Sequence, residues 1–463
     1  MTATKKQRMM TEGSVLGGLI RTALPLILAN ILYQSFHVAD TLMVGRWGGD
    51  TPEACAAELA AVGSTGALIT CIVSIFAGLS VATAVCVARE LGANDESEIR
   101  KTVHTSVCLG LVGGLLAGLI CGAFARPLLI LMDTDAAVLE GAVSYMRAYA
   151  VGIPANILYT FFVSVLTARG EPILHTVCLT ASGIVNVGLN AVAILVFGMG
   201  AVGVALATAI SQWMALLVVL TFMIRRTDCC RLEWSRLRFD GRKLGELLSI
   251  GIPSGIQGGL FAVSNVFTQS AVNSFGEIMV AGNTAAANIE TYLAVIQSGI
   301  GNAARVYLAQ NFGAKSTGRV KRVLTVATAL AMGVALATSL SAYFGAEQIL
   351  TLFAPENPEV VAMGMYRATM VLLPYFLFGA VNVGTSLLQG LGKKLLPAAL
   401  LIGGCCVLRV LWVELLFRLF FATSPEVLYA VYPVSWAATA LAMYIGVFAV
   451  YRQFKKQTEL SAL

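Results

Sequence analysis

Long apolar stretches separated by short polar connections run through this 463-residue chain. A helix needs roughly 20 apolar residues to cross the hydrocarbon core of a bilayer, whereas strands of a membrane barrel are about 10 residues long and alternate in polarity. The pattern therefore predicts an all-α integral membrane protein with twelve transmembrane helices. Their approximate positions are 20–45, 59–87, 102–125, 139–166, 174–197, 201–224, 245–275, 280–308, 323–345, 360–388, 395–421 and 428–451.

The second half of the chain repeats landmarks of the first. The matching pairs are Leu24-Pro25 with Ile252-Pro253, Leu91-Gly92-Ala93 with Phe312-Gly313-Ala314, and Arg147, Pro154 and Gly170 with Arg367, Pro374 and Gly390. A duplicated membrane chain with prolines at matching places is typical of secondary transporters. We expect an N-terminal six-helix lobe over 15–224, a basic linker over 225–243 and a C-terminal six-helix lobe over 244–451, with cytoplasmic tails over 1–14 and 452–463.

Composition and charge agree with a membrane location. Charged residues make up 12% of the chain, against about 25% in a typical soluble domain. The net charge of +6 comes from Lys and Arg in alternate connections, and such residues mark the cytoplasmic side of short loops. We therefore expect both termini in the cytoplasm and the chain in a bacterial inner (plasma) membrane. Because the basic residues are spread over several connections, they predict no nucleic-acid partner.

The first predicted helix carries an aspartate, Asp40, with His37 three residues earlier on the same face. A charged side chain within a bilayer costs a few kcal/mol, so it needs a partner or a function. Asp40 could hold Na⁺, take up a proton or pair with a cationic substrate. The alternative is a structural hydrogen bond to a polar neighbour.

Neutral polar residues in three other predicted helices supply oxygen atoms. Asn186 and Asn190 are one turn apart and share a helix face, while Thr208 and Asn156 lie in neighbouring helices. Oxygen ligands around a carboxylate suit a hard cation or a proton. We predict an ion-coupling or substrate site at these residues, with Na⁺ at Asp40, Asn186, Asn190 and Thr208 as one alternative. Amides also join membrane helices, so a structural role stays open for each.

The second half offers Glu290 beside a polar series in the preceding helix. Glu290 is either a second titrating or substrate-binding carboxylate, or it fixes packing with a basic residue. Aromatic rings near Asp40 could add cation–π contacts to a cationic substrate, although packing is their default role. The predicted substrate cavity includes Tyr33, Phe36, His37, Phe161 and Gln269.

Other charges in the predicted spans have structural explanations. Glu414 and Arg418 are spaced to form an ion pair on one helix. The repeated pair Arg147 and Arg367 is expected to anchor two helices at the outer face. Arg409 lies near mid-membrane, and its role is left open.

The sequence lacks the motifs of several classes of enzyme and of nucleotide-binding proteins. There is no G-x-x-x-x-G-K-[ST] loop for a nucleotide, no H-E-x-x-H metal pair and no G-x-S-x-G nucleophile turn. We therefore expect neither an enzyme nor a nucleotide partner, and no cofactor beyond a coupling ion. The ten cysteines, including the adjacent Cys229 and Cys230, are interpreted as small hydrophobic filler.

Taken in order, several stretches resemble the multidrug and toxic compound extrusion (MATE) transporters. They are Ala23-Leu24-Pro25-Leu26-Ile27, Ala39-Asp40-Thr41-Leu42-Met43-Val44-Gly45, Leu59-Ala60-Ala61-Val62-Gly63, Glu90-Leu91-Gly92-Ala93-Asn94 and Gln310-Asn311-Phe312-Gly313-Ala314. The resemblance covers about residues 15–450. It implies two six-helix lobes around a central V-shaped cavity, and export of organic cations in exchange for Na⁺ or H⁺.

The resemblance also implies roles for individual residues. Asp40 falls on the family's first-helix aspartate, Asn186 on its helix-5 asparagine and Thr208 on its helix-6 threonine. Two departures stand out: Asn190 replaces a second aspartate of many relatives, and Phe261 replaces the helix-7 glutamate of one branch. The Phe261 departure argues against the sodium site of that branch and favours coupling through Asp40, while the Asn190 departure lowers the charge of the site and leaves the choice between Na⁺ and H⁺ open.

These observations predict a secondary efflux antiporter for amphiphilic, mostly cationic compounds, working as a monomer in the lipid bilayer by alternating access of its lobes. The nearest alternative is a lipid-linked oligosaccharide flippase of the same superfamily, which should line its cavity with several Arg or Lys residues. A membrane channel or scaffold is a further alternative. A channel would not need titratable groups in both repeats, and it would conduct without coupling to an ion gradient.

Overall fold

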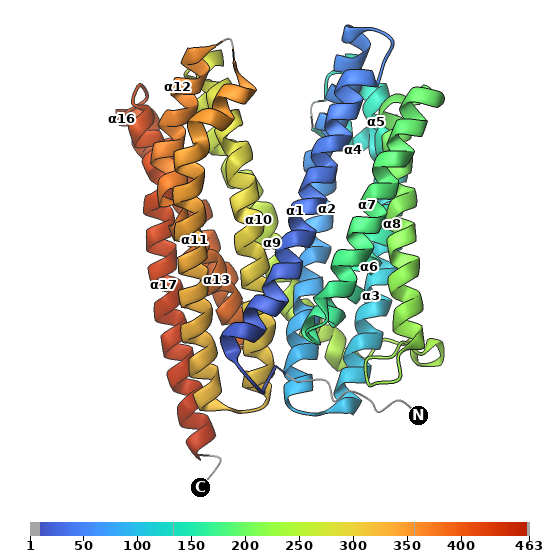
Figure 1. Ribbon diagram of the computed structural model, residues 1–463, viewed down its shortest axis with the longest axis vertical. Coiled ribbons are helices and arrows are strands. Elements are labelled where there is room, and N and C mark those ends of the chain that lie inside the picture. The colour runs from blue at the N-terminus through green and yellow to red at the C-terminus, as the bar shows by residue number, and fades with distance from the viewer. Residues whose placement is uncertain (1–9, 133, 356, 461–463) are drawn as a thin grey trace. The chain divides into compact units, whose positions relative to one another are not determined.

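The computed structural model describes residues 10–132, 134–355 and 357–460, so the first nine and last three residues of the predicted tails lie outside it. Helices make up nearly all of this part, and no strand occurs in it (Figure 1). The prediction of an all-helical membrane protein is confirmed.

The helices follow the predicted stretches closely, and several spans are divided into shorter elements. Proline begins many of them, because the missing N–H at a helix start costs nothing. The elements are α1 Val15–Trp47, α2 Pro52–Gly92, α3 Glu96–Ala123, α4 Ala125–Leu131, α5 Ala136–Ala150, α6 Ile153–Ala168, α7 Pro172–Ala191, η1 Val192–Val196, α8 Gly200–Arg225, η2 Trp234–Arg236, α9 Gly241–Asn273, α10 Glu277–Gly313, α11 Thr317–Phe353, α12 Pro358–Arg367, η3 Ala368–Leu372, η4 Leu373–Tyr375, α13 Phe376–Gly390, α14 Leu396–Leu401, η5 Ile402–Val407, α15 Leu408–Leu411, η6 Trp412–Phe417, α16 Arg418–Phe420 and α17 Pro425–Leu460.

Ten helical segments within the described residues are long and apolar enough to cross a membrane. The bent pair α5 and α6, with an angle of 45°, raises the number to eleven if it forms one span. The remaining predicted span corresponds to α10, which is 37 residues long but richer in polar residues. Twelve spans are therefore reached only by counting this more polar helix.

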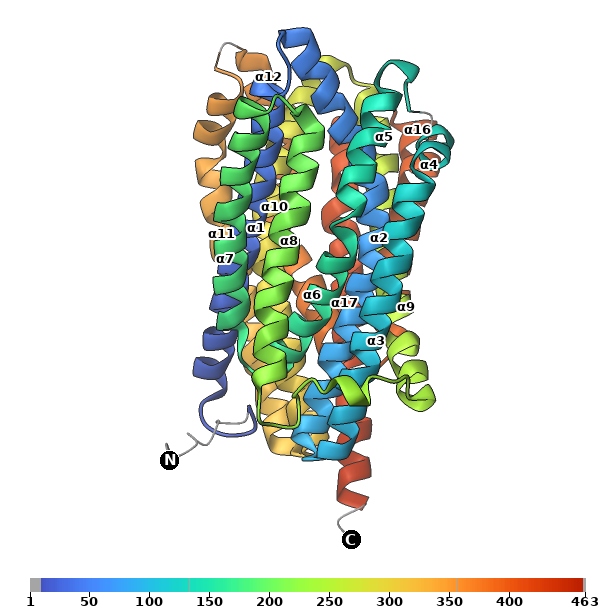
Figure 2. The ribbon, with the colours of Figure 1, turned by 90° about the vertical axis from the view of Figure 1, so that its right-hand side faces the viewer.

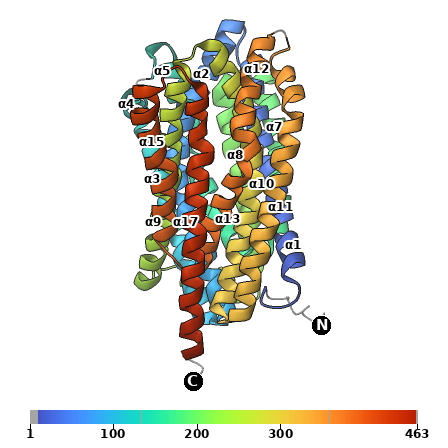
Figure 3. The same cartoon turned by 90° about the vertical axis from the view of Figure 1, so that its left-hand side faces the viewer.

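The chain divides into two compact units. Compared with the predicted lobes, each unit contains one short segment that was expected to belong to the other. The N-terminal unit comprises 28–256, and within the described residues the C-terminal unit comprises 10–27 with 257–460. The start of α1 thus belongs with the late helices, and the start of α9 belongs with the early ones. Helices α3, α7 and α8 of the N-terminal unit can be followed in Figure 2, and α11, α13 and α17 of the C-terminal unit in Figure 3.

Glycines allow each exchanged segment to pack closely within its unit. A Cβ atom at Gly78 of α2 would lie 2.2 Å from the backbone nitrogen of Gly255 in α9. A Cβ atom at Gly299 of α10 would lie 2.4 Å from Ile27 of α1. Because small residues let membrane helices approach at the backbone, these contacts hold the exchanged segments in place.

The turn between the second and third helix of each repeat has the same backbone conformation. Asn94 and Lys315 both adopt a left-handed conformation, with φ of 55° and 54°. Their N–H groups donate to the carbonyls of Leu91 and Phe312. The sequence repeat is therefore also a structural repeat at this turn.

Four segments of π-helix interrupt the α-helices of the described chain. The segment η1 begins two residues after Asn190, and η3 begins directly after Arg367. Two more, η5 and η6, flank the four-residue α15 that carries Arg409. Because π-helix is rare and often marks functional sites, these residues are candidates for function.

Candidate functional site

Asp40 is joined to polar residues of two other helices in the N-terminal unit. Asn190 Nδ2 in α7 donates to Asp40 Oδ1 in α1 over 2.5 Å. The chain of contacts continues from Asn190 Nδ2 to Asn186 Oδ1, 3.4 Å away. Asn186 Nδ2 then donates to Thr208 Oγ1 of α8 over 3.2 Å. The structure thus brings together four of the predicted site residues.

These four side chains form an oxygen-rich group within the unit. Asn186, Asn190 and Thr208 are 5%, 0% and 9% exposed, and Asp40 is half-buried. The Oδ1 atom of Asn190 is buried, and no donor among the described residues reaches it. An unused amide oxygen beside a carboxylate is suited to a hard cation. The donor set therefore fits Na⁺, and its carboxylate is equally able to hold a proton.

Aromatic side chains lie on the helix that carries Asp40 and on α5. The rings of Tyr33 and His37 meet edge to face with centroids 4.5 Å apart. The rings of Tyr145 and Tyr149 stack with centroids 6.0 Å apart and belong to one apolar cluster with Val44 of α1. Sequence reasoning used Tyr145 only as a repeat landmark and did not select Tyr149. The signal available in the sequence was the one-turn spacing of these two tyrosines in α5, the helix that ends at the bend.

Other predicted site residues of this unit lie in packing positions. Phe36 packs on Gly183 of α7, where a Cβ atom would overlap its ring. Phe161 is fully buried in a core with Met146 and Ile157. Asn156 is half-buried in α6, and within the described residues no hydrogen bond joins its side chain to the Asp40 group.

In the C-terminal unit, Glu290 is paired with an arginine. Arg367 at the end of α12 donates from Nε and Nη2 to the two carboxylate oxygens of Glu290 over 2.6 and 2.9 Å. Arg367 is 5% exposed, while its repeat counterpart Arg147 is exposed. Of the two interpretations of Glu290, the observed contacts are those of packing with a basic residue. The anchoring role expected for Arg367 is thus accompanied by a buried ion pair.

A chain of side chains extends this ion pair to α9. Arg367 Nη1 and the hydroxyl of Tyr429 both donate to Asn283 Oδ1. Asn283 Nδ2 donates to Gln269 Oε1 over 2.9 Å, and Gln269 Nε2 donates to Asn273 over 2.9 Å. Gln269, predicted to line the cavity, therefore belongs to the Glu290 network of the C-terminal unit.

Arg409 is a second buried cation of the C-terminal unit. It is 1% exposed, and it donates only to neutral groups, Ser435 Oγ at 3.1 Å and Asn265 Oδ1 at 3.2 Å. Its guanidinium carbon lies 5.3, 4.6 and 5.6 Å from the ring centroids of Phe261, Tyr432 and Trp436. Phe261, the residue that departs from the family glutamate, is therefore part of an aromatic cage around an arginine.

The energetic balance at Arg409 is unusual. Each cation–π contact contributes about 0.5–2 kcal/mol, whereas burial of an ion costs several kcal/mol even after relaxation. Within the described residues no carboxylate lies at ion-pair distance from Arg409 to make up the difference.

The predicted pair of Glu414 and Arg418 is confirmed at 3.2 Å, and it is separate from Arg409.

The sequence pattern of one family, MatE, matches residues 25–192 and 253–413. The two matched segments fall in the two halves of the repeat and together cover most of the chain. The chain belongs to the MatE family.

Named relatives are similar to this MatE chain over most of its length. The probable multidrug resistance protein YoeA of Bacillus subtilis is 26% identical over 429 residues, which cover 91% of this chain and 90% of YoeA. The multidrug resistance protein PmpM of Pseudomonas aeruginosa is 26% identical over 356 residues, covering 74% and 72%.

Solved structures share the fold. An outward-facing multidrug resistance MATE transporter of the MOP superfamily superposes with a TM-score of 0.89 at 20% identity, covering 98% of this chain and 99% of that one. A MOP superfamily transporter from Pyrococcus furiosus, described as having a binding pocket of reverse polarity, superposes at 0.90 with 20% identity and the same coverage. The resemblance found in the sequence motifs is confirmed.

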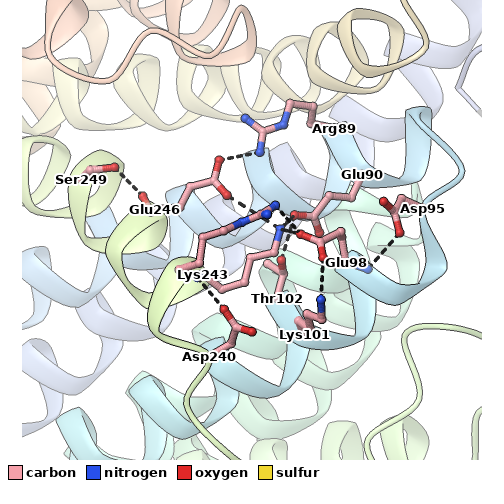
Figure 4. Close-up of polar contacts among 11 residues, drawn as sticks. Arg89, Glu90, Asp95, Glu98, Lys101, Thr102, Asp240, Lys243, Glu246 and Ser249 are labelled. Carbon is pink, nitrogen blue, oxygen red and sulfur yellow. Dashed lines mark hydrogen bonds and ion pairs between the residues drawn. The ribbon is translucent and has the colours of Figure 1, made fainter.

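This MatE chain also has an ionic cluster in the N-terminal unit where α9 begins (Figure 4). Lys243 is 2% exposed, and its Nζ lies 2.5 Å from Glu90 of α2 and 2.9 Å from Glu98 of α3. Arg89 pairs with Glu246 of α9 at 2.5 Å. Sequence reasoning placed Lys243 in a basic linker and missed this cluster, which ties the exchanged start of α9 to its unit.

At the equivalent place in the C-terminal unit, two side-chain amides and Arg319 form hydrogen bonds with backbone groups. The N–H of Met10 donates to Gln310 Oε1 over 3.1 Å, and Asn311 Nδ2 donates to the Met10 carbonyl over 3.3 Å. Arg319 donates to the carbonyls of Met10, Glu12 and Gly13. By the repeat, Asn311 occupies the position of Glu90.

The linker of this MatE chain is fixed by a second group of ion pairs. Arg226 lies 2.7 Å from Glu171 and 2.6 Å from Asp228. Burial alone would raise the pKa of Glu171, but hydrogen bonds and charge from Arg226 and Arg169 outweigh it and hold this pKa below its usual range. Potential metal-ligating atoms of Asp228, Cys229 and Cys230 lie within 4.8 Å of one another. Because the Asp228 carboxylate is already paired with Arg226 and Arg169, we assign no metal there.

Proposed function

We propose that this protein is a secondary active efflux antiporter that exports amphiphilic, mostly cationic organic compounds in exchange for Na⁺ or H⁺. The observation that carries the proposal is the Asp40 group, in which a half-buried carboxylate contacts an amide with an unused oxygen. Membership of a transporter family and the multidrug resistance names of relatives support the substrate class.

The location follows from the same reasoning. A chain with this many apolar helices is a multi-pass membrane protein. The basic connections favour a bacterial plasma membrane with both termini in the cytoplasm. We propose that the protein functions as a monomer.

The chemistry assigned to the site is exchange at one carboxylate. When Asp40 is charged, it attracts an organic cation or Na⁺, and Asn190 donates a hydrogen bond that favours the charged form. When Asp40 holds a proton, its attraction for an organic cation is lost. Asn186, Asn190 and Thr208 would supply neutral oxygens to Na⁺. Each ligand shifts the transport equilibrium only by its different affinity for the two conformations.

The test is ethidium efflux from cells that lack other pumps. Wild type and Asp40→Asn are compared with a Na⁺ gradient or a proton gradient imposed separately. We expect efflux under one of the two gradients and its loss in the variant, which would also identify the coupling ion. Absence of efflux of ethidium and related cations under both gradients would contradict the proposal.

The buried arginines of the C-terminal unit favour one second candidate, a flippase for a pyrophosphate-linked lipid. Arg367 is committed to Glu290, which leaves Arg409 and the half-buried Arg305. Two such cations are few for a pyrophosphate with several negative charges, so the antiporter is preferred. Transfer of a lipid-linked oligosaccharide across proteoliposomes, without ethidium efflux, would reverse this preference.

A further inference from the structure

The aromatic cage around Arg409 contains two buried hydrogen-bond donors without acceptors. Arg409 Nη2 and Trp436 Nε1 both lack a partner among the described residues. The two side chains are 1% and 2% exposed. Buried donors are nearly always satisfied in folded proteins, so each exception needs an explanation. Two exceptions in one cluster point to a missing acceptor.

The charge of the cluster indicates what kind of acceptor is missing. Arginine stays protonated in proteins, and the contacts of Arg409 are hydroxyl, amide and aromatic groups without a negative charge. Arg367, the other arginine beside Tyr432, is already neutralised by Glu290. A neutral acceptor would satisfy the donors, but only an anion would also compensate the charge of Arg409.

The two donors belong to neighbouring side chains. The Arg409 guanidinium carbon lies 5.6 Å from the Trp436 ring centroid. The cluster offers two N–H donors without a partner in the described residues. A halide ion or one carboxylate can be bound by so few donors, whereas a larger polyanion would need more donors than the cluster offers.

The local backbone is consistent with a binding site. Arg409 lies on α15, which has π-helix on both sides. A π-helical turn places an extra residue in the helix and commonly occurs at functional positions. The aromatic rings that close the cage come from α9 and α17, so the site is built by three segments of one unit.

We propose that Arg409 and Trp436 form an anion-binding site in the C-terminal unit, which takes a halide ion or the carboxylate group of an organic compound. This site goes beyond the proposed cation antiport, because it lies apart from the Asp40 group and binds the opposite charge. The same chemistry could come from an inorganic ion or from a substrate, and the experiment separates these sources.

The experiment measures direct binding of radioactive chloride and of radioactive benzoate to the purified full-length protein in detergent, with sodium sulfate as the background salt. We expect saturable binding of at least one of the two anions to wild type. Saturable chloride binding would identify an inorganic anion, while binding of benzoate alone would identify a carboxylate of an organic substrate. Saturable binding of neither anion would overturn the proposal.

Three variants connect the binding to these residues. Arg409→Met removes the charge, and Trp436→Phe removes the indole N–H while keeping an aromatic ring. Each should weaken binding by about tenfold or more. Arg418→Met removes a partly exposed arginine of the same span and should leave binding unchanged. If Arg409→Met does not fold, Trp436→Phe still decides, because unchanged affinity in that variant would overturn the assigned site. Ethidium efflux plays no part in this assay, so its failure and that of the antiport proposal are distinguishable.

Discussion

Asp40 and Glu290 are half-buried carboxylates in two units built from one repeat, yet their surroundings differ. Asp40 accepts a hydrogen bond from the neutral amide of Asn190. Glu290 accepts two hydrogen bonds from the buried guanidinium of Arg367. An amide donor carries no charge, whereas a bidentate arginine brings a full positive charge to the carboxylate. The two halves thus share a scaffold and differ in the polar partner of the carboxylate, and our proposal places ion coupling at Asp40.

The repeated arginine has different surroundings in the two halves. Arg147 and Arg367 are offset by the same distance as the repeated Pro and Gly. Arg147 is exposed, and Arg367 is 5% exposed in the Glu290 pair. The same repeat position thus lies on the surface of the N-terminal unit and forms an internal ion pair in the C-terminal unit.

Removal of the charge at Asp40 should give the largest effect on transport. Asp40→Asn keeps the shape of the side chain but cannot attract a cation or exchange a proton. We expect gradient-driven ethidium efflux to fall about tenfold or more, with little change in thermal stability. The control Asp50→Asn, at an exposed position, should transport normally. Efflux that survives Asp40→Asn but is lost in Glu290→Gln would reverse the comparison.

Removal of the charge at Glu290 should act on stability. Glu290→Gln leaves Arg367 buried without its counter-charge, and a broken buried ion pair costs about 3 kcal/mol or more. The double variant Glu290→Gln with Arg367→Met should recover most of this loss, because neither charge then remains. The thermal unfolding midpoint in detergent measures both. A single variant as stable as wild type would show that the pair contributes little.

The attachments of the two exchanged segments, at Lys243 and at Arg319, extend the comparison. Lys243→Met removes the buried cation between Glu90 and Glu98, and we expect a loss of about 2 kcal/mol. Arg319→Met removes hydrogen bonds from a partly exposed arginine to backbone carbonyls, and the loss should be nearer 1 kcal/mol. Thermal unfolding in detergent at low and high salt tests both. Equal losses with equal salt dependence would contradict the distinction between an attachment by ion pairs and one by hydrogen bonds to backbone carbonyls.

The smallest effect is expected at the linker. The pKa of Glu171 is held below its usual range, so its ion pairs stabilise the fold above the unfolded pKa of about 4.3. This contribution is lost as the pH falls through the lower pKa of the folded state. Because these groups are partly exposed, Glu171→Gln should cost less than about 1 kcal/mol at pH 7. The difference from wild type in unfolding midpoint should shrink as the pH falls below about 4.3, and a difference that grows on acidification would contradict the assignment.

Much of the Asp40 group could be predicted from sequence, because its parts follow from local rules. The spacing of Asn186 and Asn190 places both on one helix face, and a carboxylate in an apolar helix is a functional candidate. The partners of Glu290 and Arg409 depend on how distant helices pack. Arg367 is 77 positions from Glu290, and Asn265 is 144 positions from Arg409. Sequence periodicity carries no information about such pairings.

The ionic cluster around Lys243 was missed for a related reason. Lys243 stands in a run of basic residues, which indicates a solvated loop at the cytoplasmic face. The structure buries it because α9 begins inside the N-terminal unit, where two glutamates of neighbouring helices face it. The matching prolines revealed the repeat, but not the exchange of segments that the close contacts of Gly78 and Gly299 permit.

The exchange of segments has a consequence for biosynthesis. Residues 28–256 contain every part of the N-terminal unit, so that unit can assemble before the rest of the chain is made. The start of α1 has its partners far downstream, and the hydrogen bond from Met10 to Gln310 spans 300 positions. At about 5–20 residues per second, this distance corresponds to roughly 15–60 s of synthesis. The first helix to enter the membrane is therefore among the last to be locked in place, and it must wait there half-packed until the second repeat arrives.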